Sequence, residues 1–252
     1  PESLKNFMEL VGVAKSNSSV DYAMLEYCIR DDLKPKAPRV MAVLDPIKLV
    51  IDNYPEGQVE YLDAQINMEN PELGVKQVPF GKELWIERED FMEEPPKKYF
   101  RLFPGNEVRL MNAYFVKCVG FEKDENGKVT VVHCTYDPIT KNGTGFTGRK
   151  VKGTIHWVPV QQAKKATVRL YENLVDEEKG VYNEDGSVNL NPNSLTIVDA
   201  YIEPSIEEYK PGDSFQFVRS GYFCIDTKDS TEGNPVFNRI VSLKSSFKLP
   251  KK

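Results

Sequence analysis

Cysteine and histidine are scarce in this sequence, and long apolar runs are missing. Its 252 residues include 4 cysteines and 2 histidines, and Cys28, Cys118, Cys134 and Cys224 lie far apart without C-x-x-C spacing. We therefore predict reduced, mostly buried thiols and no metal site. No apolar stretch approaches the roughly 20 residues of a membrane helix, and the N-terminus has no basic region followed by an apolar one. No membrane partner is expected, and a cytoplasmic location follows by default.

Positive charge is not in excess either. The formal net charge is -5 at pH 7, whereas a protein that coats nucleic acid without sequence preference needs clustered lysines and arginines to neutralise phosphates. That class is therefore excluded, and we expect no DNA partner. A domain that contacts a few splayed RNA bases needs only a handful of well-placed cations, so RNA binding stays open.

Common catalytic motifs are absent as well. The sequence has no glycine-rich phosphate loop after a strand, no G-x-S-x-G pattern and no H-E-x-x-H pattern. His133 and His156 each lie in an alternating segment with no serine or cysteine nearby to activate. We interpret both as structural or strand-edge histidines and predict no catalytic residue.

The N-terminal segment carries the only helical pattern. Ser3 is a candidate cap for a short amphipathic helix that stops near Gly12. Ser18 or Ser19 is a candidate cap for a second helix, which should end before Pro35 because the residue before a proline is disfavoured in helical geometry. Residues 1–36 are therefore predicted to form a small α-helical module.

The rest of the chain has the pattern of short strands. Val, Ile, Tyr, Phe and Thr are frequent there, and turn residues separate the alternating segments, with the clearest hairpin turn at 124–127, which reads Asp-Glu-Asn-Gly. The predicted strand segments are 39–54, 83–88, 107–120, 128–136 and 151–158. Many short strands without α/β alternation are typical of β-barrels, so the predicted fold class is mainly β.

Four stretches of the sequence match motifs of one protein family in the same order. They read A-P-R-V-M-A-V-L-D-P at 37–46, E-V-R-L at 107–110, K-V-K-G-T-I-H-W-V at 150–158 and F-Q-F-V-R-S-G-Y-F-C at 215–224. Through them nearly the whole chain resembles the C-terminal, tRNA-binding half of the glutaminyl-tRNA synthetases, which are class I aminoacyl-tRNA synthetases. The resemblance implies two six-stranded β-barrels of the ribosomal protein L25 type, stacked end to end with exchanged strands, over 37–155 and 156–252.

The activity that this resemblance implies belongs to the intact enzyme. The family ligates glutamine to tRNA(Gln) with ATP in a Rossmann-type domain, marked by a His-Ile-Gly-His-like motif and a Met-Ser-Lys-like loop, and neither motif occurs here. We therefore expect an excised fragment that is inactive alone and binds no cofactor, since ATP would bind only the intact enzyme. The expected partner is the anticodon loop of tRNA(Gln), and the expected state is a monomer.

The same motifs supply candidates for reading the middle anticodon base, a uridine. By resemblance, Arg39 matches the family's arginine in A-P-R-x-M-A-V, and Gln216 and Arg219 match the amide and the guanidinium of F-Q-F-x-R-x-G-Y-F. A uridine presents acceptors and a donor on its pairing edge, and an amide supplies both kinds of group. Because side chains alternate along a strand, Gln216 should lie on the face opposite Phe215 and Phe217.

Cations elsewhere are assigned to the other two anticodon bases by resemblance. Arg101 matches an arginine that binds the third base, a guanosine, whose O6 and N7 accept from an arginine fork. Lys98 stands nearby, where the family often has a different polar residue. Arg109 is expected to contact the first base, but the family's second arginine there is Met111 in this chain. Lys244 is a further candidate for RNA contact.

Each of these assignments has an alternative. The cations could be solvated residues at strand starts or at strand edges, where charge blocks aggregation. A further basic group is interpreted first as part of a solvated loop, although it could contact phosphates; its members are Lys141, Arg149, Lys150 and Lys152. The chain could also be the matching module of an archaeal or eukaryotic glutamyl-tRNA synthetase, although F-Q-F-x-R favours the glutaminyl family. The last alternative is a β-barrel interaction protein without an RNA role, which the negative net charge and Met111 would favour.

Overall fold

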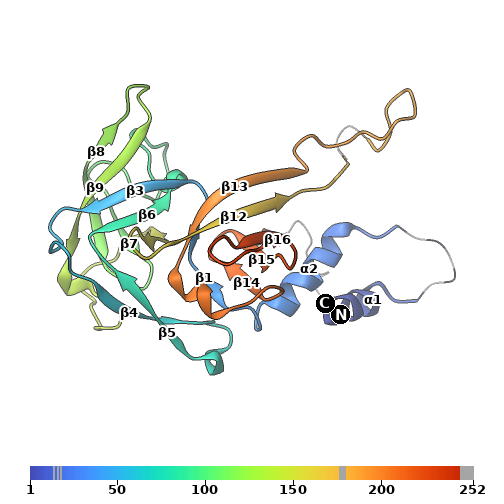
Figure 1. Ribbon diagram of the computed structural model, residues 1–252, viewed down its shortest axis with the longest axis horizontal. Coiled ribbons are helices and arrows are strands. Elements are labelled where there is room, and N and C mark those ends of the chain that lie inside the picture. The colour runs from blue at the N-terminus through green and yellow to red at the C-terminus, as the bar shows by residue number, and fades with distance from the viewer. Residues whose placement is uncertain (14, 16, 18, 176–179, 245–252) are drawn as a thin grey trace.

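The computed structural model describes residues 1–13, 15, 17, 19–175 and 180–244, and strands dominate this part of the chain (Figure 1). Helices α1 (Glu2–Val11) and α2 (Tyr22–Leu33) pack against each other at the N-terminus. Ile29 and Leu33 of α2 also pack on the buried side chains of Tyr222 and Val241. Neither helix is long and apolar enough to cross a membrane.

The helices extend over the predicted ranges, but the predicted caps are wrong. Ser3 lies inside α1, where its Oγ donates to Asp32 Oδ2 of α2 at 2.8 Å, and no side chain caps that helix. The cap of α2 is Asp21 rather than Ser19, and Ser18 lies outside the described residues. The Asp21 carboxylate accepts from a backbone N–H of the first turn at 2.9 Å, and its negative charge also favours the positive end of the helix dipole.

Among the described residues the strands form two seven-stranded sheets and a two-stranded ribbon. The first sheet contains β3 (Pro46–Ile51), β6 (Glu83–Glu87), β7 (Glu107–Leu110), β8 (Phe115–Lys123), β9 (Val129–Asp137), β10 (Thr154–Ile155) and β11 (Val158–Pro159). The second contains β1 (Arg39–Val40), β2 (Ala42–Val43), β12 (Lys164–Tyr171), β13 (Leu195–Ile202), β14 (Ser214–Phe217), β15 (Gly221–Ile225) and β16 (Val236–Ser242). The ribbon pairs β4 (Glu60–Gln65) with β5 (Val75–Phe80).

In each sheet, the two edge strands come from one short segment of the chain, and this segment closes the sheet into a barrel. The strand orders are β10-β7-β8-β9-β3-β6-β11 and β1-β14-β15-β16-β12-β13-β2, so residues 154–159 supply both edges of the first sheet and residues 39–43 both edges of the second. If the two edge strands of each sheet are counted as one bent strand, each barrel has six strands, as predicted. Residues 39–43 precede all strands of the first barrel in the sequence yet complete the second barrel, which confirms the predicted strand exchange. The exact domain boundaries stay predictions.

Aromatic side chains fill both barrels. Trp157 is fully buried in the first, where its ring meets that of Phe80 edge to face with centroids 5.1 Å apart. In the second, Phe217 stacks on Phe223 at 4.3 Å. The alternation along β14 leaves Gln216 on the face opposite the buried phenylalanines, as predicted. The four cysteines are free, and three of them are buried, which confirms the prediction for the thiols.

A histidine links neighbouring strands at the outside of the first barrel. His133 of β9 lies with Nδ1 2.8 Å from Asp52 Oδ1 and Nε2 3.0 Å from Glu122 Oε1. The hydrogen bond with Asp52, aided by the one with Glu122 and only partly opposed by burial, raises the pKa of His133. Such a group stabilises the fold at pH values below its unfolded pKa, and this contribution is lost as pH rises through the higher folded pKa.

His133→Gln is therefore expected to lower the free energy of unfolding by about 0.5 kcal/mol at about pH 5 and by less at about pH 9, the small size reflecting the exposure of the pair. Urea unfolding at both pH values measures this difference. An equal loss at the two pH values would show that the ionic interaction contributes nothing.

Candidate nucleic-acid interface

Two residues predicted to read one base form a pair where the exchanged strand enters the second barrel. Strand β1 runs parallel to β14, and Arg39 is in register with Gln216. Arg39 Nε donates to Gln216 Oε1 at 3.1 Å. The amide NH₂ of Gln216 is thereby left to donate to another acceptor, and the Arg39 side chain stays 20% exposed.

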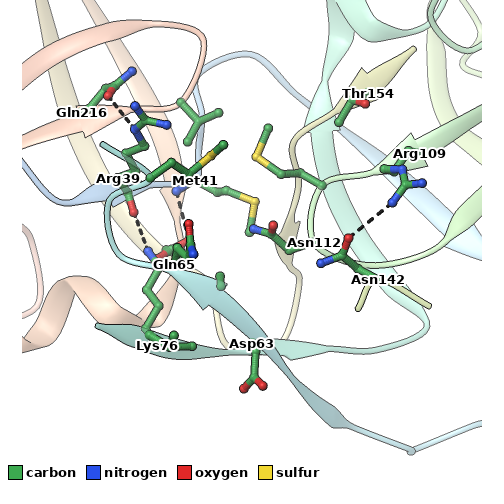
Figure 2. Close-up of a pocket in the computed structure, with 16 residues that line it drawn as sticks. Arg39, Met41, Asp63, Gln65, Lys76, Arg109, Asn112, Asn142, Thr154 and Gln216 are labelled. Carbon is green, nitrogen blue, oxygen red and sulfur yellow. Dashed lines mark hydrogen bonds and ion pairs between the residues drawn. The ribbon is translucent and has the colours of Figure 1, made fainter. Parts of the chain in front are cut away.

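A cavity of about 520 Å³ lies between the two barrels beside this pair (Figure 2). We call it the inter-barrel cavity; it is lined by Arg39, Met41, Asp63, Ala64, Gln65, Met68, Val75, Lys76, Arg109, Met111, Asn112, Asn142, Thr154, Glu203, Gln216 and Val218. Arg109 of β7 reaches it opposite Arg39, and its Nη1 donates to Asn142 Oδ1 at 3.3 Å. The structure therefore brings Arg39, Gln216 and Arg109 to one cavity.

A buried ion pair holds the wall of the inter-barrel cavity together. Glu203, only 1% exposed, accepts from Lys76 Nζ and from the backbone N–H of Met41, the latter at 3.0 Å. Lys76 also donates to the carbonyl oxygen of Arg39 at 2.6 Å. The ribbon strand β5 is thus bonded to the backbone of β1, which fixes the position of Arg39. Sequence reasoning missed this ribbon, although Leu62 and Ala64 alternate with polar residues.

Three methionines contribute to the apolar lining of the inter-barrel cavity. Met41, Met68 and Met111 line the cavity, and Figure 2 labels Met41 close to Arg39. Methionine presents a soft, polarisable surface, and a mainly apolar cavity with a few placed polar groups is typical of a ligand site. Arg109 is thus flanked by an apolar side chain at Met111, where the resembled family has a second arginine.

A second cavity, of about 480 Å³, adjoins the first, and Thr154 lines both. We call it the basic hollow; it is lined by Glu89, Met92, Lys98, Tyr99, Phe100, Arg101, Lys152, Gly153, Thr154 and Arg219. Three further predicted residues, Lys98, Arg101 and Arg219, therefore lie together. Arg219 does not line the inter-barrel cavity with Arg39 and Gln216, the two residues to which the motif relates it.

A buried carboxylate orients the two arginines of the basic hollow. Asp90 is 0% exposed; its two oxygens accept from Arg219 Nη1 and Nη2 at 2.6 and 2.7 Å, and Arg101 Nη1 lies 3.0 Å from Oδ1. Burial opposes the charged form of Arg219, but the hydrogen bonds and attraction of Asp90 outweigh it and raise the pKa of Arg219. No sequence pattern distinguished Asp90 from the chain's solvated acidic residues.

His156 connects this pair to the second barrel. Its Nδ1 accepts from Arg219 Nη1 at 3.2 Å, and its Nε2–H donates to the carbonyl oxygen of Ala42 in β2 at 2.8 Å. Because a guanidinium can only donate, Nδ1 is the acceptor of this ring and Nε2 carries the donor N–H. His156 is 1% exposed, in agreement with the structural role assigned to it.

The remaining basic candidates lie outside the two cavities or are partly neutralised. Lys244 is exposed after β16 and lines neither cavity. Lys141 Nζ lies 2.8 Å from Glu60 Oε2, and Arg149 Nη2 lies 2.6 Å from Glu107 Oε1. Within the described ranges no three His, Cys, Asp or Glu side chains are grouped so as to hold a metal ion.

Comparison with known proteins assigns this arrangement to a family. A family profile described as "tRNA synthetases class I (E and Q), anti-codon binding domain" matches residues 37–137, and a second profile with the same description matches residues 154–226. The chain belongs to this family. The matched ranges contain the candidate residues Arg39, Lys98, Arg101, Arg109, Gln216 and Arg219, whereas Lys244 lies outside them.

Curated relatives agree with this family. Glutamine–tRNA ligase of Clostridium perfringens is 57% identical over 253 residues, which cover 99% of this chain and 45% of the relative. The glutamine–tRNA ligase of Clostridioides difficile is 54% identical (98% of this chain, 45% of the relative), and that of Cupriavidus taiwanensis is 53% identical (98% and 43%). The chain spans less than half the length of these relatives.

Proposed function

We propose that this chain recognises the anticodon loop of tRNA(Gln) as part of a glutamine–tRNA ligase, which joins glutamine to that tRNA with ATP. The reaction and the ATP site would lie in the part of the longer protein that this chain does not match. A cytoplasmic location and a monomeric state belong to the same proposal.

The Arg39–Gln216 pair supports this proposal most directly. The two side chains meet across a parallel strand pair at the inter-barrel cavity. Because Gln216 Oε1 accepts from Arg39, its NH₂ can donate to a uracil oxygen while the guanidinium faces the other acceptor of the base. The methionines beside the pair offer an apolar surface to the face of that base.

The test measures the dissociation constant of this chain for a glutamine tRNA and for the same tRNA with its middle anticodon base changed. We expect the unchanged chain to prefer the native uridine. Arg39→Ala should weaken binding of the native tRNA by about 10- to 100-fold and remove most of the preference, as loss of a base-reading arginine does.

Arg169→Ala is the matched control for Arg39→Ala. Arg169 is 24% exposed, against 20% for Arg39. Both are ion-paired: Arg39 Nη2 lies 3.7 Å from Glu69 Oε1, and Arg169 Nη2 lies 2.6 Å from Asp229 Oδ2. Arg169 lines neither cavity, so the control should leave affinity and base preference unchanged. Equal losses in the two variants, or no preference in the unchanged chain, would contradict anticodon reading at this site.

The glutamyl alternative is tested by the third anticodon base. Glutamine and glutamate anticodons share the middle uridine and differ in the third base, which is G for glutamine and C for glutamate. A chain that prefers G at this position is a glutamine-type module, and one that prefers C is a glutamate-type module. The Arg101 side chain in the basic hollow supports G, because an arginine fork matches the O6 and N7 acceptors.

A further inference from the structure

Phe100 is a large apolar side chain exposed within a hollow that four cations line. Its exposure is 47%, and Lys98, Arg101, Lys152 and Arg219 belong to the same basic hollow. Covering an exposed aromatic ring with a flat group is energetically favourable. The surrounding positive charge favours a partner that also carries negative charge.

The backbone around Phe100 is fixed on both sides, so the exposed ring belongs to an ordered segment. Tyr99 Oη donates to the carbonyl oxygen of Glu89 at 2.9 Å. The N–H of Leu102 donates to the carbonyl oxygen of Asp90 at 2.9 Å, and Leu102 is fully buried. The structure therefore presents the ring from a rigid support.

Two of the four cations of the basic hollow have no acidic partner among the described residues. Arg101 and Arg219 share the carboxylate of Asp90, but neither Lys98 nor Lys152 forms an ion pair with any residue the structure describes. Lys152 Nζ lies 5.1 Å from the centroid of the Phe100 ring, which is within the range of a cation–π contact. The ring and the ammonium group together match a flat base that is followed by a phosphate.

We propose that Phe100 is a stacking platform for one unstacked base of the tRNA anticodon loop, and that Lys152 binds a phosphate of the same strand. The proposal rests on the proposed function and adds two residues to it. Stacking depends little on base identity, because every base has a flat face. Phe100 therefore contributes affinity, whereas the arginines and Gln216 contribute the choice of base.

Substitutions at Phe100 separate stacking from apolar packing. Phe100→Leu keeps an apolar side chain without the ring, and we expect it to weaken binding to a glutamine tRNA transcript about tenfold. Phe100→Tyr keeps the ring and should bind as the unchanged chain does. Tyr171→Leu is the matched control, since Tyr171 is 44% exposed and lines neither cavity; it should leave binding unchanged.

Salt dependence tests the role of Lys152. The slope of log K against log salt concentration is negative, and Lys152→Ala should make it less negative by about 0.7. This is the value for one phosphate contact on a single strand. Phe100→Leu should leave this slope unchanged, because a stacking contact releases no counterion. An unchanged slope in Lys152→Ala would overturn the phosphate contact.

The Arg39→Ala variant measured beside these separates the stacking role from the proposed function. Normal binding by Phe100→Leu together with weak binding by Arg39→Ala would overturn the stacking role and leave anticodon reading in place. Normal binding by both variants would overturn the two together. A Phe100→Tyr variant as weak as Phe100→Leu would also overturn the stacking role, since the ring would then be present without effect.

Discussion

Gly153→Ala is expected to destabilise the fold by about 3 kcal/mol, near the upper end of overpacking costs, and to lower tRNA affinity on the order of tenfold or more. A Cβ at this position would lie 1.8 Å from the carbonyl oxygen of Phe100 and 2.9 Å from its carbonyl carbon. Backbone atoms cannot turn aside as the end of a flexible side chain can. The clash would displace the segment that carries Lys98 and Arg101, and with it one wall of the basic hollow.

Gly120→Ala is the control for this prediction. Gly120 lies in β8, and a Cβ there would meet nothing within 4 Å, so the change should stay within about 0.5 kcal/mol. Urea unfolding and tRNA binding measured on both variants give the comparison. A Gly153→Ala variant as stable as Gly120→Ala would show that the contact between residue 153 and Phe100 is not a rigid part of the fold.

Asp90→Asn is expected to lower the free energy of unfolding by about 3 kcal/mol. This value is at the lower end of the cost of breaking a buried ion pair, because the arginine partners of Asp90 are partly solvated. The carboxylate is 0% exposed, while Arg219 is 24% and Arg101 is 35% exposed. An amide keeps the size but removes the negative charge and turns N–H donors toward a guanidinium. Both arginines should then leave the orientation in which they line the basic hollow.

The neighbouring acid provides the control for Asp90→Asn. Glu89 contacts both Arg101 and Arg219 but is 68% exposed, so Glu89→Gln should cost no more than about 0.5 kcal/mol. Thermal or urea unfolding of the two variants measures the difference. A double-mutant cycle of Asp90→Asn with Arg219→Ala should give a coupling of about 1 kcal/mol or more; additive losses would mean that the bidentate pair contributes nothing as a pair.

Strand β14 is an example of a strand pattern that could be read from the sequence. In β14 the order Phe215, Gln216, Phe217 alternates between the core and the outer face, and the prediction for Gln216 is confirmed. The ribbon β4–β5 was missed although Leu62, Ala64, Val78 and Phe80 are buried in the core with Trp157. The predicted strand over 39–54 is three strands in two different barrels, since its pairing depends on partners far away in the chain.

The candidate site was readable only as separate motifs. Arg39 and Gln216 are 177 positions apart and meet through the pairing of β1 with β14. The motif groups Arg219 with these two residues. Arg219, however, has a positive φ of 68°, and the direction of its side chain depends on this backbone geometry. Its bond to Asp90, 129 positions away, places it in the neighbouring hollow.

Local order along the chain was enough to predict the family, the mainly β fold and a set of candidate RNA contacts, because alternation and motifs are properties of neighbouring residues. The grouping of those contacts into two adjoining cavities depends on packing. Asp90 resembles any solvated aspartate in the sequence, and only the fold removes its water and places two arginines against it. Burial and long-range pairing exist only after the barrels have closed, so the environment that orients each side chain has no local signature.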